Sequence, residues 1–573
     1  MKLMECVPNF SEGRDSSILN AIAAAIKSVK GVVLLDMDPG ADTNRTVFTI
    51  AGEPEAVVEA AFQAIKKAAE LIDMSKHKGA HPRMGATDVC PFIPISEMTM
   101  EECVEYANKL GKRVGEELGI PVYLYEYAAT KEEWKNLANI RSGEYEALSE
   151  KAKDPYWKPD FGPHTFNAKS GATAIGAREF LIAYNINLNT RDKKKASEIA
   201  QIIRESGRAA RDKNGKLMKD ENGNTIYIPG LFTHCKAVGW FIESYDRAQI
   251  SINLTNYKIT PPHLVLEKVR ELASEMGIQV TGSELVGLIP KAAILEAGKF
   301  YLSRMNESTG IPERMIMQTA IQSMGLAELA PFDIDKKVIE YAISRKDRLV
   351  NLKVDAFCDL LSTDEPAPGG GSVAALCASM SGALSAMVAN LTIGKKGYEN
   401  VAKEAMELAP IGQEIKEKSL EVIDKDTDAF FTMMDAMRLP KKTEEEIEFR
   451  KTQIEKCTQA AINAPLETMH LAMSAAELAL KIAKIGNANA LSDAGVAALT
   501  ANCASQAAYY NILINLPGIA DENYIHKIHA EAKDLLEKCN LLCDSVEKDV
   551  LAKLMGEKVE KSRGETHDLI CGK

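Results

Sequence analysis

Apolar residues follow two different spacings along the first 177 residues. Segments with apolar residues at every second position, or in short continuous runs, predict β-strands at 3–7, 32–37, 46–51 and 88–95. Segments with apolar residues every three or four positions predict helices at 16–28 and 54–72. In chain order these elements give β-α-β-β-α-β, the split βαβ arrangement. A helix at 100–118 and a strand at 121–125 extend it.

The same order of elements returns between residues 178 and 330. Strands are predicted at 180–188, 238–243, 249–254 and 278–281, and helices at 192–206 and 262–276. The polar segment 212–225, rich in Gly and Asn, predicts either a protruding hairpin or a flexible insertion. We therefore expect two consecutive α/β subdomains of ferredoxin-like type.

Strand-like patterns stop near residue 330, and the chain beyond consists of long segments rich in Ala, Leu, Glu, Lys and Met. Helices are predicted at 372–392, 399–437, 443–485 and 494–516. The sequence thus predicts a multidomain protein in which an all-α helical bundle follows the two α/β subdomains. The expected bounds are 1–177, 178–330, a linker at 331–350, and 351–573.

Composition narrows the class of protein. The chain has 573 residues, 46% of them hydrophobic, and a net charge of −12, which argues against a nucleic-acid-binding protein. Its eleven cysteines are scattered without CxxC pairing, which favours reduced thiols and a cytoplasmic protein. Residues 366–394 carry no charge and are long enough to span a membrane. Because they are mostly Ala, Ser and Gly, we expect a tightly packed buried helix and no membrane span.

Two of the nine histidines, His77 and His81, stand four residues apart. Pro82 lies beside the second one and argues for a shaped loop rather than a helix. One histidine could act as a general acid–base, tuned by Lys78, Arg83 and a nearby carboxylate. The residues alone equally allow a structural loop with hydrogen-bonded histidines, or a metal site if further ligands converge there.

A second polar cluster lies between two predicted strands, in residues 36–46. Asp38, Asn44 and Arg45 are candidates for binding polar ligand groups, because loops at strand ends often carry such residues. An ordinary acidic turn explains the same composition.

A third cluster is the glycine run Gly369, Gly370 and Gly371, which leads directly into a predicted helix with Ser372 as its expected N-cap. The free N–H groups at such a helix start suit a carboxylate or a phosphate, although the lysine of a P-loop is missing. A flexible turn with a cap is the alternative.

A fourth cluster, Asp424, Asp426 and Asp428, lies on a predicted long helix. Asp424 and Asp428 share one face of that helix, and Asp426 points elsewhere. Most such clusters are solvated surfaces, but a buried member could be an acid–base carboxylate.

Eleven segments distributed over nearly the whole chain resemble the formimidoyltransferase-cyclodeaminase family. In chain order they are ECVPNFSEGR, DTNRTVFTIAG, HKGAHPRMGATDVCPFIPI, SGEYEAL, PDFGP, FLIAYNINL, VGLIP, APGGGSVAA, DTDAF, AMRLPK and YYNILINL. The resemblance implies a bifunctional folate enzyme of histidine degradation. Its first half would transfer a formimino group between N-formimino-L-glutamate and tetrahydrofolate. Its second half would cyclise 5-formiminotetrahydrofolate to 5,10-methenyltetrahydrofolate and release ammonia.

The resemblance also implies roles for particular residues. His81 falls on the family's transferase histidine, Asp426 on its proposed deaminase carboxylate, and Asp38 in its transferase cleft. The family's folate-contacting loop falls on residues 162–171, with Gly162, Pro163, His164 and Gly171 as binding residues. Polyglutamylated tetrahydrofolate is expected as a co-substrate, without a metal. The expected assembly is a homo-oligomer built from dimers, such as an octamer, in the cytoplasm.

Other functions remain to be weighed against this one. A formyl-group transferase fused to a methenyltetrahydrofolate cyclohydrolase-like domain is the main alternative, and a non-catalytic folate-binding protein is another. The presence of both His81 and Asp426 argues against the latter. Glu284 stands where the resemblance predicts an amide residue, so the amino-acid substrate is less firmly implied than the folate.

Overall fold

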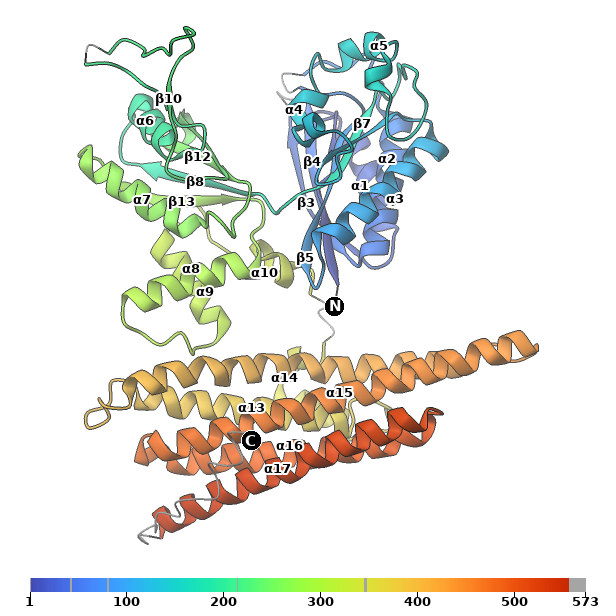
Figure 1. The fold of residues 1–573 in the computed structure, drawn as a ribbon, viewed down its shortest axis with the longest axis vertical. Helices are drawn as coiled ribbons and strands as arrows, with labels where there is room; N and C mark the ends of the chain where they lie inside the picture. Colours follow the sequence, from blue (N-terminus) through green and yellow to red (C-terminus); the bar gives the residue numbers. More distant parts are fainter. Residues whose placement is uncertain (1, 42–43, 80–81, 214, 345–347, 556–573) are drawn as a thin grey trace. The chain divides into compact units, whose positions relative to one another are not determined.

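A computed structural model describes residues 2–41, 44–79, 82–213, 215–344 and 348–555. The chain divides into two compact units, which are treated separately below (Figure 1). One unit comprises Met1–Gly298 with Ala320–Ser344, and the other Lys299–Thr319 with Arg345–Lys573.

The first sheet has the strand order of a ferredoxin-like fold, extended on one side. Four antiparallel strands lie in the order β3, β4, β1, β5, and the parallel strands β7 and β6 follow β5. Their bounds are β1 Leu3–Cys6, β3 Val32–Gly40, β4 Arg45–Gly52, β5 Thr87–Ser96, β6 Val122–Glu126 and β7 Thr173–Ala177. A two-residue strand, β2 (Asn9–Phe10), pairs with both β4 and β5 beyond the end of β1. The predicted βαββαβ order is confirmed.

One face of this sheet is covered by the helices α1 (Ser16–Lys27), α2 (Pro54–Leu71) and α3 (Met100–Leu118). Alternate strand residues such as Cys6, Phe48 and Phe92 are fully buried in the shared core. This follows from the two-residue period of a strand, which sends every second side chain to the same face.

The segment after β6 covers part of the opposite face. It contains only short helices: η1 (Glu132–Lys135), α4 (Leu137–Ile140), η2 (Tyr145–Ala147), α5 (Leu148–Lys151) and η3 (Pro155–Trp157). Trp134 packs edge-on against Tyr123 of β6, with 5.3 Å between the ring centroids, in a second, smaller core. This packing fixes residues 141–146 over the sheet, where they enter the candidate site described below.

The second sheet repeats the same topology. Its antiparallel strands lie in the order β11 (Cys235–Ile242), β12 (Arg247–Leu254), β8 (Ile182–Leu188), β13 (Val280–Val286). Helix α6 (Lys193–Ile203) follows β8 and α7 (Pro262–Glu275) follows β12, as the sequence pattern predicts. The predicted insertion lies between the strands of a short antiparallel pair, β9 (Arg208–Ala209) and β10 (Tyr227–Ile228), so it is of the hairpin kind.

The second unit is a bundle of long helices. Its main members are α12 (Val354–Leu361), α13 (Gly370–Thr392), α14 (Ala402–Met437), α15 (Glu444–Ile485), α16 (Leu491–Asn515) and α17 (Glu522–Leu554). Helix α13 packs against α14, α15 and α16 (Figure 1). By length and composition α13 could cross a membrane, but 67% of its most apolar stretch is buried inside the protein. Its small residues allow the close approach of its neighbours, as expected of a core helix.

One predicted boundary is wrong. The sequence pattern ends the second strand at residue 37 and assigns Asp38 to a loop, whereas β3 continues to Gly40 with Asp38 opposite Val47 of β4. The strand lies at the edge of the sheet, where the exposed Asp38 side chain stays in water. Polar composition therefore does not interrupt the backbone pairing there.

Candidate active sites

The histidine loop of the first unit is tied down at His77. Nε2 of His77 donates a hydrogen bond to the backbone carbonyl of Asn44 at 2.9 Å. Nε of Arg83 donates to Nδ1 of His77 at 3.3 Å. Both ring nitrogens of His77 are therefore in use, one as a donor and the other as an acceptor. It fits the structural interpretation of the loop. His81 and Ala80 lie outside the described residues.

Asn44 connects this loop to two other segments. Its side-chain oxygen accepts a hydrogen bond from the backbone N–H of Gly13 at 3.0 Å, and its side-chain nitrogen donates to the carbonyl of Lys78 at 3.0 Å. The residue has a positive φ of 47°, a conformation that asparagine adopts more readily than most residues. Asn44, predicted as a ligand-binding residue, thus holds the start of the histidine loop against the end of the first sheet.

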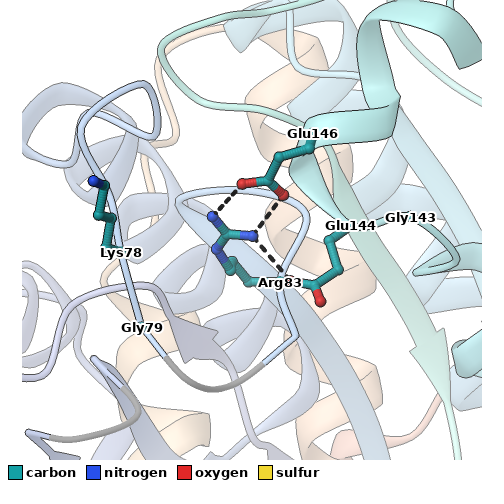
Figure 2. Close-up of a pocket in the computed structure, with 6 residues that line it drawn as sticks. All are labelled: Lys78, Gly79, Arg83, Gly143, Glu144 and Glu146. Carbon is teal, nitrogen blue, oxygen red and sulfur yellow. Dashed lines mark hydrogen bonds and ion pairs between the residues drawn. The ribbon is translucent and has the colours of Figure 1, made fainter.

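Arg83 fixes the other end of the loop. Its guanidinium forms two hydrogen bonds with Glu146, at 2.7 and 2.8 Å, and one with Glu144 at 2.9 Å (Figure 2). Hydrogen bonding from Arg83 lowers the pKa of the Glu146 carboxyl. These bidentate, charge-assisted contacts are the strong kind, so they orient the loop as well as hold it.

A cavity of about 420 Å³ opens between these groups. It is lined by Lys78, Gly79, Arg83, Gly143, Glu144 and Glu146. In Figure 2 the Lys78 side chain extends away from the two glutamates. The volume is within the range of small-molecule sites, and the lining is almost entirely polar. The cavity therefore suits a small polar molecule that carries both positive and negative charge.

Arg45, the remaining predicted residue of this region, belongs to a buried ion cluster. Arg45 and Arg141 both bind the same oxygen, Oδ2, of the fully buried Asp88. The other oxygen of Asp88 accepts a hydrogen bond from the backbone N–H of Met84 at 2.9 Å. Burial lowers the pKa of Arg45, and the neighbouring Asp88 opposes that effect. The side chain of Asp38, in contrast, makes no hydrogen bond or ion pair within the described part of the chain.

The predicted folate-contacting loop lies against the same sheet. Gly171 has a positive φ of 67°, and an added Cβ there would lie 2.1 Å from the carbonyl oxygen of Met84, so only glycine fits. Pro163, His164 and Gly171 help to line a cavity of only about 10 Å³, and Nε2 of His164 is buried without a hydrogen-bond partner. Gly162 also has a positive φ, 83°.

In the helical unit the structure brings two predicted motifs together. The hydroxyl of Ser372 donates a hydrogen bond to Oδ2 of Asp426 at 3.0 Å, and the backbone N–H of Ser372 also bonds this carboxylate. A Cβ on Gly371 would lie 2.2 Å from Oδ1 of Asp426. The start of α13 does bind a carboxylate, and that carboxylate comes from α14 of the same chain.

The expected capping role of Ser372 is wrong. Gly369 is the N-cap of α13, and the helix includes Gly370 and Gly371 before it reaches Ser372. The helix can start earlier because the carboxylate of Asp426 replaces the usual capping side chain in accepting a backbone N–H.

The three aspartates of α14 have different surroundings. Burial raises the pKa of Asp426, and its bonds to Ser372 only partly offset this. Asp424 is the more deeply buried of the two, and it accepts hydrogen bonds from Nε of Arg348 at 2.9 Å and the backbone N–H of Leu349 at 2.8 Å. Asp428 is exposed. Asp426 is therefore the member of the cluster that is placed as an acid–base group would be.

Comparisons with known proteins agree over most of the chain. The model of the formiminotransferase domain, N-terminal subdomain, matches residues 3–178, that of the formiminotransferase domain residues 183–344, and that of formiminotransferase-cyclodeaminase residues 353–534. The formimidoyltransferase-cyclodeaminase of Dictyostelium discoideum is 42% identical over 540 residues, which cover 94% of this chain and 96% of that one. The chain belongs to the formimidoyltransferase-cyclodeaminase family. It is a bifunctional enzyme of that family.

Relatives that match only one part of the chain support its division into a transferase part and a helical cyclodeaminase part. The glutamate formimidoyltransferase of Streptococcus pyogenes serotype M1 is 42% identical over 301 residues, 52% of this chain and 93% of its own length. The methenyltetrahydrofolate cyclohydrolase of Methylorubrum extorquens is 33% identical over 204 residues, 36% of this chain and 98% of its own length.

Sequence reasoning about this family member missed four site residues: Asp88, Arg141, Glu144 and Glu146. Two signals were available. The glutamates lie two apart in the segment SGEYEAL, and Asp88 lies in the histidine segment itself. Neither signal identifies the arginine partner, because the contacts join residues 43 to 63 positions apart.

Proposed function

We propose that the α/β part of this chain transfers a formimino group between N-formimino-L-glutamate and tetrahydrofolate, and that the helical part cyclises the product to 5,10-methenyltetrahydrofolate with release of ammonia. The first activity would belong to the subdomains 1–177 and 178–330, and the second to 351–573, with 331–350 as a linker. The observation that carries the proposal is the pairing of Asp426 with the start of α13, where a partly buried carboxylate accepts from the hydroxyl and the backbone N–H of Ser372.

In the transfer step, N5 of tetrahydrofolate attacks the formimino carbon and forms a tetrahedral adduct. The bond from this carbon to the glutamate nitrogen then breaks. The attacking amine loses a proton and the leaving amine gains one, so a single imidazole near neutral pKa can serve both. We assign this role to His81, because both ring nitrogens of His77 are occupied by Asn44 and Arg83. The exposed carboxylate of Asp38 would stabilise the cationic adduct.

In the cyclisation step, N10 attacks the formimino carbon and ammonia departs. One proton must leave N10 and one must reach the leaving nitrogen. Asp426 can carry it, since burial raises its pKa above the usual value of an aspartate carboxyl. Gly369, Gly370, Gly371 and Ser372 would bind the folate beside it.

The test follows both products in one reaction. Purified protein is mixed with tetrahydrofolate and N-formimino-L-glutamate, and methenyl product absorbance and free ammonia are recorded. We expect His81→Ala to lose transfer about 10²–10⁴-fold while cyclising supplied 5-formiminotetrahydrofolate normally. We expect Asp426→Asn to lose cyclisation alone. Full activity of both variants would overturn the assignment.

The alternative of a formyl-group transferase is tested in the same assay. N-formyl-L-glutamate replaces the formimino compound, and a formyl transferase would react with it without releasing ammonia.

The folate would contact the predicted folate loop, at Gly162, Pro163, His164 and Gly171. The unpartnered Nε2 of His164 supports a polar ligand there. Lys78, which lines the 420 Å³ cavity, would attract the carboxylates of a polyglutamylated folate.

We further propose a cytoplasmic homo-oligomer built from dimers, such as an octamer. The support is an exposed apolar face on the neighbouring helices α13 and α16, with Met380, Met387, Leu391, Leu499 and Ile514 between 39% and 77% exposed. Apolar area of this kind usually packs against a second copy or another protein. Light scattering should give a multiple of the dimer mass, and Leu499→Lys with Ile514→Lys should lower it. A monomeric wild type would contradict the proposal.

A further inference from the structure

The ion cluster around Asp88 has more positive than negative charge. Arg45 and Arg141 share the carboxylate of Asp88. The side chain of Arg45 is 8% exposed, that of Arg141 is 16% exposed, and that of Asp88 is 0% exposed. Both guanidiniums stay protonated at any pH at which proteins fold. One positive charge is therefore uncompensated inside the cluster, and a largely buried charge without a partner is costly.

Both arginines also have N–H groups that make no hydrogen bond within the described part of the chain. Nε of Arg45 donates a hydrogen bond to the side-chain oxygen of Asn9 at 3.2 Å, and its Nη1 donates to Asp88. Arg141 uses Nη2 on Asp88, and its buried Nε has no partner. Within the described part of the chain, Nη2 of Arg45 and Nη1 of Arg141 make no hydrogen bond either. Because both groups bind one oxygen, they lie side by side with spare N–H groups.

Each of the three segments that form the cluster also carries, nearby in sequence, a residue of the candidate transfer site. Arg45 directly follows Asn44, whose carbonyl holds His77. Asp88 binds the backbone N–H of Met84, the residue after Arg83. Arg141 lies two residues before Gly143, which lines the 420 Å³ cavity. The same short segments thus build the cavity and the cluster.

We propose that Arg45 and Arg141 form a carboxylate-binding subsite of the transferase, with Asp88 as the positioning residue that holds the two guanidiniums together. This inference rests on the proposed transfer function. A pair of adjacent guanidiniums with free N–H groups matches the geometry of a carboxylate, which would also neutralise the excess charge. Both transferase substrates end in a glutamate moiety, so the ligand is a glutamate carboxylate of either the formimino donor or the folate.

The experiment uses the full-length protein and substrates that lack one carboxylate at a time. Transfer is measured for wild type and Arg141→Gln with N-formimino-L-glutamate, its α-amide and its γ-amide, and with tetrahydrofolate or tetrahydropteroate as acceptor. We expect Arg141→Gln to raise KM at least about tenfold for one carboxylate-bearing substrate, and to have little effect once that carboxylate is absent. Arg141→Lys should recover part of the loss.

The ratio of two substrates in one preparation does not depend on the folded fraction, so a merely structural loss cannot imitate the result. Arg191→Gln, which removes an exposed arginine paired one-to-one with Asp246, is the matched control and should leave the ratios unchanged. If the rise in KM caused by Arg141→Gln disappears with one amide of the formimino donor, the subsite binds the corresponding carboxylate of the donor. If the rise disappears with tetrahydropteroate, the subsite binds the glutamate carboxylate of the folate. Equal penalties for all substrates would overturn the subsite, while an inactive wild type would instead contradict the proposed transfer.

Discussion

The two candidate sites of this protein are built by different means. In the α/β unit, charged groups from separate segments hold the histidine loop, with Arg83 bound to Glu144 and Glu146 and Arg45 bound to Asp88. In the helical unit, the backbone at Gly371 approaches the Asp426 carboxylate so closely that no side chain fits between them. The first site should therefore depend on charge and the second on volume.

Among the substitutions that test this contrast, a single added methyl group should have the largest effect. Gly371→Ala introduces a Cβ 2.2 Å from Oδ1 of Asp426, so the carboxylate must move. Displacement of a catalytic group by about 1 Å can cost on the order of 10²-fold in rate. We expect cyclodeamination to fall by about that factor, with transfer unchanged. The assay uses 5-formiminotetrahydrofolate and records ammonia.

The control for this change lies two residues away. A Cβ on Gly369 would meet nothing within 4 Å, so Gly369→Ala should lose far less activity. Equal losses in the two variants would show that the glycines act through flexibility or ligand contact, and the contrast drawn above would fail.

A second prediction concerns a buried carboxyl group in the α/β unit. Burial raises the pKa of Glu5 from 4.5 to about 7, partly offset by Arg178. The folded state holds the proton more tightly than the unfolded state, so the contribution of Glu5 to stability is greatest below pH 4.5 and is lost as the pH rises to about 7. Glu5→Gln should remove this loss, which amounts to about 3 kcal/mol at pH 8.

Denaturant unfolding at pH 4 and pH 8 checks this expectation. The variant should gain stability over wild type at pH 8 and little at pH 4. Glu132→Gln, in which the side chain is 81% exposed, serves as a control without pH dependence. A gain of the same size at both pH values would mean that packing, rather than ionisation, separates the two proteins.

The smallest effect should follow from removal of one hydroxyl. The hydrogen bond from Ser372 lowers the pKa of Asp426, while its backbone N–H contributes separately. Ser372→Ala should therefore raise this pKa further, and the acid limb of the cyclodeaminase pH–rate profile should move to higher pH. Transfer should show no such shift. A profile that moves to lower pH would contradict the assigned role of the hydroxyl.

The sequence pattern predicts much of this architecture. The two-residue period of strands such as β4 and β12 and the helical period of α2 and α7 predict both ferredoxin-like units in the right order. These periods arise from local backbone geometry, which each segment has wherever it is placed. The end of β3 was misjudged because an edge strand tolerates the exposed Asp38.

The sequence alone determined many of the candidates, since His77, Arg45 and Ser372 stand out by type and spacing and Asp426 by the family resemblance. Only the tertiary structure decided what each one does. It assigns both nitrogens of His77 to neighbours, pairs Asp426 with the start of α13, and adds Arg141 to Asp88. Hydrogen bonds and close contacts of this kind depend on which distant segments meet, and no local pattern of hydrophobic and polar residues records that.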